Sequence, residues 1–245
     1  MEEAEAGEAR RTAHLTTRAC AEIAEATTIL FGKEFPEHID AIKDEIKGLS
    51  NFIFVGPESA RPAYADSLDD LLAASPTKNP DIPLGLLDEA GLYFTSGTTG
   101  MPKMALHTHA SYPIGHQVTG KYWLDLREDD MHWNVSDTGW AKAAWSSYFG
   151  PWSCGAALFV HHSDRFDPVK TLELLERHPV TTLCGTPTVY RMLILHYSSA
   201  RKFPALRHCV AAGEPLAAEI IEVWKRATGI TIRDGYGQTE TVLLA

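Results

Sequence analysis

The chain has 245 residues, of which 44% are apolar and 22% are charged, and its formal net charge at pH 7 is -10. The apolar fraction can fill one large hydrophobic core or two small ones, and it excludes a disordered chain. The acidic balance argues against nonspecific binding to nucleic acid or to an anionic membrane, because both need a basic surface.

No C-x-x-C pattern is present, so we expect the cysteines to be buried free thiols in a reducing compartment. The first eight residues are acidic, whereas a secretory signal would be basic and then apolar, and no apolar run reaches membrane-spanning length. The sequence therefore predicts a cytoplasmic protein without a membrane span. The cysteines are Cys20, Cys154, Cys184 and Cys209.

The N-terminal third predicts two helices and a strand. Residues 10–31 place apolar side chains on one helical face before Gly32, and Pro36 begins a second helix that ends at Gly48. Asn51–Val55 has the composition of a strand. The apolar positions are Leu15, Ala19, Ile23, Ala26 and Leu30 in the first helix, and Ile39, Ile42 and Ile46 in the second.

A domain boundary is predicted near residue 83. Residues 75–83 contain three prolines and are the best candidate for a linker. We therefore expect an incomplete, mainly helical N-terminal segment with one or two strands over residues 1–83, and a core domain over residues 84–245.

Beyond the linker, short strands alternate with helices, which predicts an α/β fold with a largely parallel sheet. Asp167 is the expected N-cap of a helix over Pro168–His178, and Gly229 should end a helix over residues 215–228. The expected strands are Gly91–Thr95, Met131–Val135, Ala156–Val160, Val180–Cys184, His208–Ala212 and Ile230–Arg233.

Residues 93–103 read Tyr-Phe-Thr-Ser-Gly-Thr-Thr-Gly-Met-Pro-Lys, which suits a phosphate-binding loop. Glycines let the main chain approach an anion, hydroxyl groups donate hydrogen bonds, and a lysine adds a mobile positive charge. The NTPase P-loop fails on spacing, because Pro102 occupies the place of its second glycine. The alternative is a simple turn after a strand. The candidate phosphate-binding residues are Thr95, Ser96, Gly97, Thr98, Thr99, Gly100, Met101, Pro102 and Lys103.

Two further groups of polar residues follow predicted strands, where ligands bind in parallel sheets. Residues 212–216 read Ala-Gly-Glu-Pro-Leu, and residues 234–241 read Asp-Gly-Tyr-Gly-Gln-Thr-Glu-Thr. Tyr236 between two glycines suits a flat purine, and the amide, hydroxyl and carboxylate that follow could hold substrate oxygens and hydrated Mg²⁺. The alternative is a turn before a helix capped by Thr239.

The loop at 93–103 resembles the signature loop of the adenylate-forming superfamily, and the segment at 234–241 resembles its Y-G-x-T-E element. The run from Phe166 to Leu193 is similar to the medium-chain acyl-CoA synthetase branch. The resemblance covers residues 90–245 well and the first 90 poorly. It implies part of the large domain of the adenylate-forming fold, without the small C-terminal domain.

The resemblance also implies a role for each motif. The loop ending in Lys103 would bind the β- and γ-phosphates of ATP, and the tyrosine would lie on adenine. Thr239 would contact the α-phosphate and Glu240 would help to bind Mg²⁺, so that Lys103, Thr239 and Glu240 are the expected catalytic residues. The other expected nucleotide-binding residues are Gly213, Glu214, Pro215, Asp234, Gly235, Tyr236, Gly237 and Gln238.

The same resemblance predicts the substrates, which are a carboxylic acid, ATP and coenzyme A. Trp140 would line the acyl and pantetheine side, although it could equally be a core aromatic residue. Acetate-specific relatives carry a tryptophan at the position of Gly237, so we expect a medium-chain, branched or aromatic acid. His107 and His109 share one face of the chain at their spacing, and the family has a comparable histidine after its glycine loop, for which a structural role is expected here.

Members of this superfamily continue past the Y-G-x-T-E element to a ribose-binding aspartate and a mobile domain with a catalytic lysine, whereas this sequence ends at Ala245. We therefore expect an incomplete chain with little adenylation activity by itself. The alternatives are a non-catalytic nucleotide-binding or interaction module, and an adenylation domain that loads a carrier protein. The oligomeric state stays open.

Overall fold

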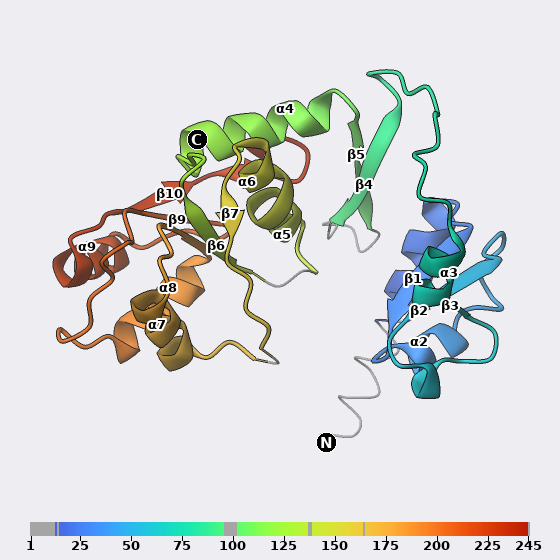
Figure 1. The fold of residues 1–245 in the computed structure, drawn as a ribbon, viewed down its shortest axis with the longest axis horizontal. Coiled ribbons are helices and arrows are strands. Elements are labelled where there is room, and N and C mark those ends of the chain that lie inside the picture. The colour runs from blue at the N-terminus through green and yellow to red at the C-terminus, as the bar shows by residue number, and fades with distance from the viewer. Residues whose placement is uncertain (1–12, 14, 96–101, 137–138, 164, 245) are drawn as a thin grey trace. The chain divides into compact units, whose positions relative to one another are not determined.

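The computed structural model describes residues 13, 15–95, 102–136, 139–163 and 165–244 (Figure 1). The chain divides into two compact units. The first unit comprises residues 1–83 and 94–104, and the second comprises residues 84–93 and 105–245.

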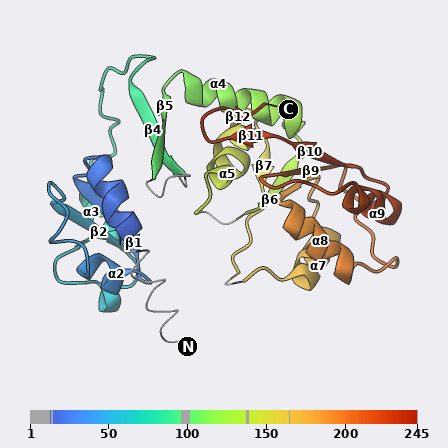
Figure 2. The same ribbon diagram turned by 180° about the vertical axis from the view of Figure 1, so that it is seen from behind.

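The first unit contains a three-stranded parallel sheet in the order β1-β2-β3. Figure 2 labels β1 and β2 of this sheet. The apolar side chains of Phe31, Ile39, Phe54 and Ala65 form its core. Its strands include β1 (Thr28–Gly32), β2 (Asn51–Val55) and β3 (Asp66–Ser67), and its helical elements include residues 15–23, α2 (Pro36–Asp40), the 3-10 helix η1 (Glu58–Ala60) and α3 (Leu68–Ala74).

The predicted helix over residues 10–31 is wrong in its second half. Residues 15–23 are helical, Glu25 has a positive φ of 50°, and the chain then enters β1. Thr28 and Ile29 are β-branched and pair with β2, so the backbone satisfies its hydrogen bonds in a sheet. Leu30 consequently lies on a strand and is 57% exposed.

The second predicted helix is shorter than expected, because α2 ends at Asp40. Ile39, Ile42 and Ile46 are nevertheless all buried, the last two from turns. The apolar positions were therefore correct, and the secondary structure assigned to two of them was not. The strand Asn51–Val55 is confirmed as β2.

The second unit contains a five-stranded parallel sheet in the order β10-β9-β8-β6-β7. The predicted α/β architecture is confirmed, and each strand predicted for this sheet exists: β6 and β9 have the predicted bounds, and the bounds of the other three differ by one or two residues. The strands are β6 (Met131–Val135), β7 (Ala157–Leu158), β8 (Thr182–Gly185), β9 (His208–Ala212) and β10 (Ile232–Gly235).

Successive residues of the central strands pack into different cores, as a period of two requires. Leu183, Cys209 and Ala211 belong to a core that includes Leu172, Tyr190, Leu193 and Trp224 from three helices. Cys184 and Val210 belong to a second core with Leu124, Leu126 and Ala156. The sheet is therefore covered on both faces, and every residue of β8 and β9 is buried.

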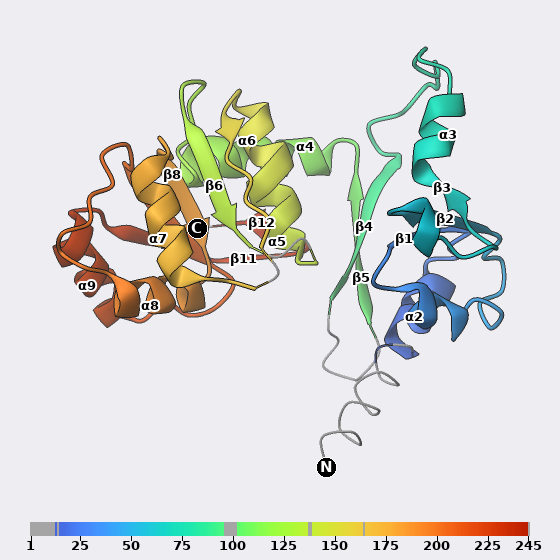
Figure 3. The same ribbon diagram turned by 60° about the horizontal axis from the view of Figure 1, so that its bottom comes forward.

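Helices α7, α8 and α9 cover one face of the sheet, and α4, α5 and α6 lie on the other (Figure 3). Asp167 caps α7 as predicted, and Gly229 ends α9 with a φ of 80°. The helices are α4 (Ser111–Val118), α5 (Ala141–Ala143), α6 (Gly150–Ser153), α7 (Pro168–Arg177), α8 (Pro187–His196) and α9 (Ala218–Thr228), with π-helical turns η2 (Thr119–Trp123) and η3 (Ala144–Phe149).

The strand before the glycine loop does not belong to the parallel sheet, contrary to expectation. β4 (Glu89–Thr95) pairs with β5 (Lys103–Thr108) in a separate two-stranded sheet. The connection over residues 96–102 is too short for the crossover that parallel strands need, which is a dozen residues or more. A second small sheet pairs β11 (Gly237–Gln238) with β12 (Val242–Leu243) antiparallel.

No helix among the described residues has both the length and the apolarity that crossing a membrane requires.

Candidate functional site

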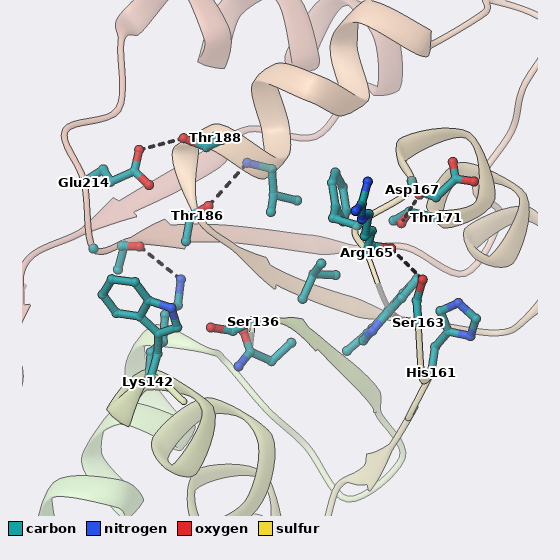
Figure 4. Close-up of a pocket in the computed structure, with 18 residues that line it drawn as sticks. Ser136, Lys142, His161, Ser163, Arg165, Asp167, Thr171, Thr186, Thr188 and Glu214 are labelled. Atoms are coloured by element: carbon teal, nitrogen blue, oxygen red, sulfur yellow. Dashed lines mark hydrogen bonds between the residues drawn. The ribbon is translucent and has the colours of Figure 1, made fainter. Parts of the chain in front are cut away.

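A pocket of about 520 Å³ lies at the carboxyl ends of β6, β8 and β9 (Figure 4). This edge is where parallel sheets bind ligands, because the loops that leave neighbouring strands diverge there. Polar and charged side chains from several loops reach the pocket. The lining includes Trp140, Lys142, Arg165, Asp167, Thr188 and Glu214.

Lys142 joins two of the strand ends. Its Nζ donates to the carbonyl oxygen of Gly185 at 2.8 Å and to that of Ala212 at 3.0 Å. The ammonium group therefore links the ends of β8 and β9 at the edge of the pocket. The sequence analysis missed this residue, although its position two residues after Trp140 could have indicated it.

The wall formed by the start of α7 is ordered by main-chain and side-chain hydrogen bonds. The Asp167 carboxylate accepts from the backbone N–H groups of Val169 and Lys170 at 2.9 and 3.0 Å. Thr171 Oγ1 donates to the Asp167 carbonyl at 2.8 Å. The Asp167 carboxylate is bound to backbone N–H groups as a helix cap. The basic side chain of Arg165 lines the same pocket and contributes positive charge to it.

The opposite wall contains two residues of the predicted adenine-side element. Gly213 has a φ of 103°, and Glu214 accepts a hydrogen bond from Thr188 Oγ1 at 2.8 Å. Both residues line the pocket, whereas the neighbouring Pro215 is exposed and is not among the described lining residues. Gly213 supports the tight turn after β9, because a left-handed φ favours glycine.

Trp140 lies in the same pocket and is 72% exposed. Trp133 and Trp145 are buried, with exposed fractions of 5% and 8%. Trp140 is therefore set apart from these core tryptophans and presents a large apolar surface to a ligand.

The tyrosine motif begins at the end of β10, where Asp234 is exposed and Gly235 is packed against an indole. A Cβ atom on Gly235 would lie 2.5 Å from Trp123 Nε1. Gly235 therefore allows the close approach of the Trp123 ring. Tyr236 itself is 60% exposed.

Gly237 is also required by the backbone. A Cβ atom there would lie 2.1 Å from the carbonyl oxygen of Val242, which is on the paired strand β12. Gln238 donates its backbone N–H to Thr241 Oγ1 at 3.2 Å. Neither Tyr236 nor Gly237 is among the described residues that line the pocket at β6, β8 and β9.

The end of the motif is held by a distant histidine. His107 Nε2 lies 2.7 Å from the carbonyl oxygen of Thr239. Glu240 is exposed. Within the described residues, no three His, Cys, Asp or Glu side chains gather as a metal site, so a metal here would depend on oxygens from a ligand as well.

Of the predicted phosphate-binding loop, Thr95 ends β4 and Lys103 begins β5, with the lysine exposed. Pro102 is partly buried and lies outside regular structure. The remaining predicted residues of the loop, Ser96, Gly97, Thr98, Thr99, Gly100 and Met101, lie outside the described residues.

Two titratable side chains lie in the sheet near the pocket, and burial keeps both neutral. Burial lowers the pKa of His132 to about 4, and its Nδ1 lies 2.6 Å from Thr182 Oγ1. Burial also raises the pKa of the Cys184 thiol. Cys184 therefore stays protonated at neutral pH and does not supply a thiolate nucleophile.

Comparison with known sequences identifies related enzymes. The family described as AMP-binding enzyme matches residues 13–245, so the match includes most of the N-terminal third. The human mitochondrial acyl-coenzyme A synthetase ACSM3 is 43% identical over 206 residues, which cover 84% of this chain and 35% of the relative. The rat protein of the same name is 55% identical over 153 residues, covering 62% and 26% of the two chains. The chain thus spans about a third of the length of the human relative.

Solved structures agree with this fold. The anthranilate CoA ligase AuaEII, solved in complex with anthranoyl-AMP, superposes with a TM-score of 0.82 at 27% identity, covering 93% of this chain and 44% of that one. An acyl-CoA synthetase from Brucella canis gives a TM-score of 0.83 at 26% identity, covering 96% and 42%.

Proposed function

Because the chain belongs to the AMP-binding enzyme family, we propose that it is part of an AMP-forming acyl-CoA synthetase. In this reaction a carboxylate attacks the α-phosphorus of ATP, which gives an acyl-adenylate and expels pyrophosphate. The thiol of coenzyme A then attacks the acyl carbon and displaces AMP.

The observation that carries the proposal is the pocket at the carboxyl ends of β6, β8 and β9. Residues of two separate family elements, Trp140 from one and Gly213 with Glu214 from another, line this one pocket. A chance match to short motifs would scatter such residues over the surface. We propose that the pocket binds the acyl and pantetheine portions, with Trp140 as its apolar wall.

The protein's task in the first step is electrostatic, because an anion must approach a polyphosphate. We propose that the residues from Thr95 to Lys103 bind the β- and γ-phosphates, and that Tyr236 stacks on adenine with Gly213, Glu214 and Pro215 beside it. Thr239 would donate its hydroxyl to the α-phosphate. The remaining motif residues, Asp234, Gly235, Gly237 and Gln238, would shape the nucleotide site.

Glu240 fits a magnesium-binding role. Mg²⁺ is usually bound by one or two carboxylates together with substrate phosphates and water, and the exposed carboxylate of Glu240 offers such a ligand. When bound, the ion would neutralise charge on the phosphates. The protein's own part is to hold this carboxylate beside Thr239.

For the acid, we propose a medium-chain, branched or aromatic substrate rather than acetate. Acetate-specific relatives carry a tryptophan at the position of Gly237, and the relatives named above include an anthranilate CoA ligase. The contact of Gly237 with the Val242 backbone is a second reason for a glycine there. Catalytic efficiencies over acetate, butyrate, octanoate and benzoate, measured on the longest reading frame that contains this chain, test the proposal. A preference for acetate would overturn it.

Two alternative functions can be distinguished from this proposal, one by the molecule that accepts the acyl group and the other by whether the protein binds nucleotide. A carrier-protein adenylation domain would form the adenylate but would not transfer the acyl group to free coenzyme A. A non-catalytic interaction module would bind no Mg²⁺-ATP. The cytoplasmic location expected from the sequence stays a prediction. The human and rat relatives are named as mitochondrial proteins, which favours the mitochondrion instead.

Nucleotide binding tests the proposal on the chain as it stands. Isothermal titration with Mg²⁺-ATP should show one site, and Lys103→Met should weaken it at least about tenfold, because a charge-assisted hydrogen bond is lost. Lys121→Met is the matched control, since Lys121 is an exposed lysine outside the motifs. Equal effects of the two substitutions, or no binding by the unaltered chain, would contradict the proposal.

A further inference from the structure

His107 makes a specific contact that its expected structural role does not require. It is four residues after Lys103 on β5 and is only 4% exposed. Its Nε2 lies 2.7 Å from the carbonyl oxygen of Thr239, which is 132 residues away in the sequence. Because a carbonyl only accepts, Nε2 carries the proton and donates it.

The segment that His107 contacts has little structure of its own. β11 and β12 have two residues each and enclose the turn that contains Thr239 and Glu240. Thr241 donates its backbone N–H to the Gln238 carbonyl at 3.2 Å, which closes this turn. Such a short hairpin is at best marginally stable alone. A contact with another part of the chain, such as that of His107, is therefore needed to fix the position of the turn at Thr239 and Glu240.

The His107 ring is itself held on several sides, which gives its N–H a fixed direction. The ring centroids of Tyr93, Tyr112 and Trp145 lie 6.1, 5.4 and 6.2 Å from that of the histidine. These three residues come from β4, α4 and η3. Ser111 Oγ also lies 3.5 Å from Nδ1, at the limit of a hydrogen bond.

We propose that His107 is a positioning residue for the tyrosine motif. Its Nε2–H fixes the Thr239 carbonyl, and thereby the directions in which the Thr239 hydroxyl and the Glu240 carboxylate project. The inference rests on the proposed function for the claim that these two groups meet ATP and Mg²⁺. The positioning itself depends only on the contact between His107 and Thr239.

Two substitutions separate the hydrogen bond from the general effect of altering a buried ring. Gln carries its amide nitrogen as many bonds from Cβ as Nε2 is in histidine, so His107→Gln can still donate to Thr239. His107→Asn keeps the amide but places its nitrogen one bond nearer the backbone, at the position of Nδ1. The control is His132→Gln, which removes the buried hydrogen bond between His132 Nδ1 and Thr182 Oγ1. This bond lies in the parallel sheet and not in the tyrosine motif.

The test combines amide spectra with ATP binding on the 245-residue chain. His107→Asn should shift the backbone amides of residues 238–241, speed their hydrogen exchange and weaken Mg²⁺-ATP binding about tenfold, which corresponds to the loss of one buried hydrogen bond. His107→Gln should restore both readouts. His132→Gln should lower thermal stability without moving these amides.

The inference is overturned if His107→Asn leaves the amides of residues 238–241 unchanged, or if His107→Gln fails to restore them. An unaltered chain that binds no Mg²⁺-ATP would contradict the proposed function instead. In that case the amide spectra still decide the positioning role, so the two failures are distinguishable.

Discussion

The parallel sheet and the segment after it, residues 236–244, are placed by different kinds of contact. In the sheet, every residue of β8 and β9 is buried, and helices cover both faces. In the segment, every described residue except Val242 is partly or fully exposed. Its contacts with the rest of the chain include the His107 hydrogen bond to Thr239 and the buried side chain of Val242, which lies beside Gly115 of α4.

This difference separates stability from the placement of functional groups. Burial is distributed over many side chains, so a substitution in the sheet should lower the free energy of unfolding. A substitution in the segment removes one directional contact and should mainly move Thr239 and Glu240. The predictions below test that separation.

The largest effect is expected in the helix-covered core. Trp224 is fully buried, with ring centroids 5.4 Å from Tyr190 and 6.3 Å from Phe203. Trp224→Ala should lower the free energy of unfolding by about 3–5 kcal/mol, because it leaves a large cavity. Urea denaturation followed by circular dichroism measures this. Trp152→Ala is the control, since Trp152 is 60% exposed, and a similar loss there would contradict the comparison.

The sheet should also determine how stability depends on pH. The pKa of His132 is about 4 in the folded chain and about 6.5 when unfolded, so only the unfolded state gains a proton between these values. The stability contributed by the neutral ring is complete above pH 6.5 and is lost as the pH falls toward 4. At pH 5 the loss is about 2 kcal/mol.

His132→Asn removes this titration while keeping an amide near Thr182. The variant should be less sensitive than the unaltered chain to a change from pH 7 to pH 5, as measured by urea denaturation at both values. An equal pH dependence in the two proteins would show that His132 is not the group responsible.

The contrast between the two regions also explains what the sequence could predict. Strands such as Met131–Val135 and His208–Ala212 were found with correct bounds because each is a short segment that contains strand-forming residues, Trp133 and Val135 in one and Val210 in the other. The helix caps at Asp167 and Gly229 were found because capping depends on the residue type at the helix end and on its nearest neighbours in the sequence. Leu30 was assigned to a helix because its environment depends on pairing with β2, which no local pattern shows.

The sequence pointed to candidate site residues through its motifs, whereas contacts between distant residues left no signal. Trp140, Gly213 and Glu214 were named from motifs and line one pocket, and their roles stay predictions. Lys142 was missed because its partners are carbonyl groups of Gly185 and Ala212, which any sequence could provide. The hydrogen bond of His107 to Thr239 spans 132 residues and was invisible for the same reason.

An intermediate effect is expected at the glycines of the motif region. Gly237→Ala would place a methyl group 2.1 Å from the Val242 carbonyl, so β11 and β12 must separate. We expect a loss of about 1–3 kcal/mol from this overpacking, with amide shifts confined to residues 236–244. Gly213→Ala is the matched control, because Gly213 has a positive φ but no atom within 4 Å of its Cβ position.

The control should cost only the backbone strain, about 1 kcal/mol. Amide shifts that spread into β8 and β9 in the Gly237 variant would show that the segment and the sheet are one cooperative structure. That result would contradict the view that the sheet determines stability and the segment determines the placement of functional groups.

The smallest effect on stability is expected at Trp140, which is 72% exposed at the pocket. Trp140→Ala should change the free energy of unfolding by no more than about 0.5 kcal/mol, because little buried surface is lost. Its removal should also shift the mean tryptophan emission to shorter wavelength, since an exposed indole emits at longer wavelength than the buried Trp133 and Trp145. Thermal denaturation and fluorescence spectra measure both quantities. A loss of several kcal/mol with unchanged emission would mean that Trp140 is a core residue, and the pocket would then lack its apolar wall.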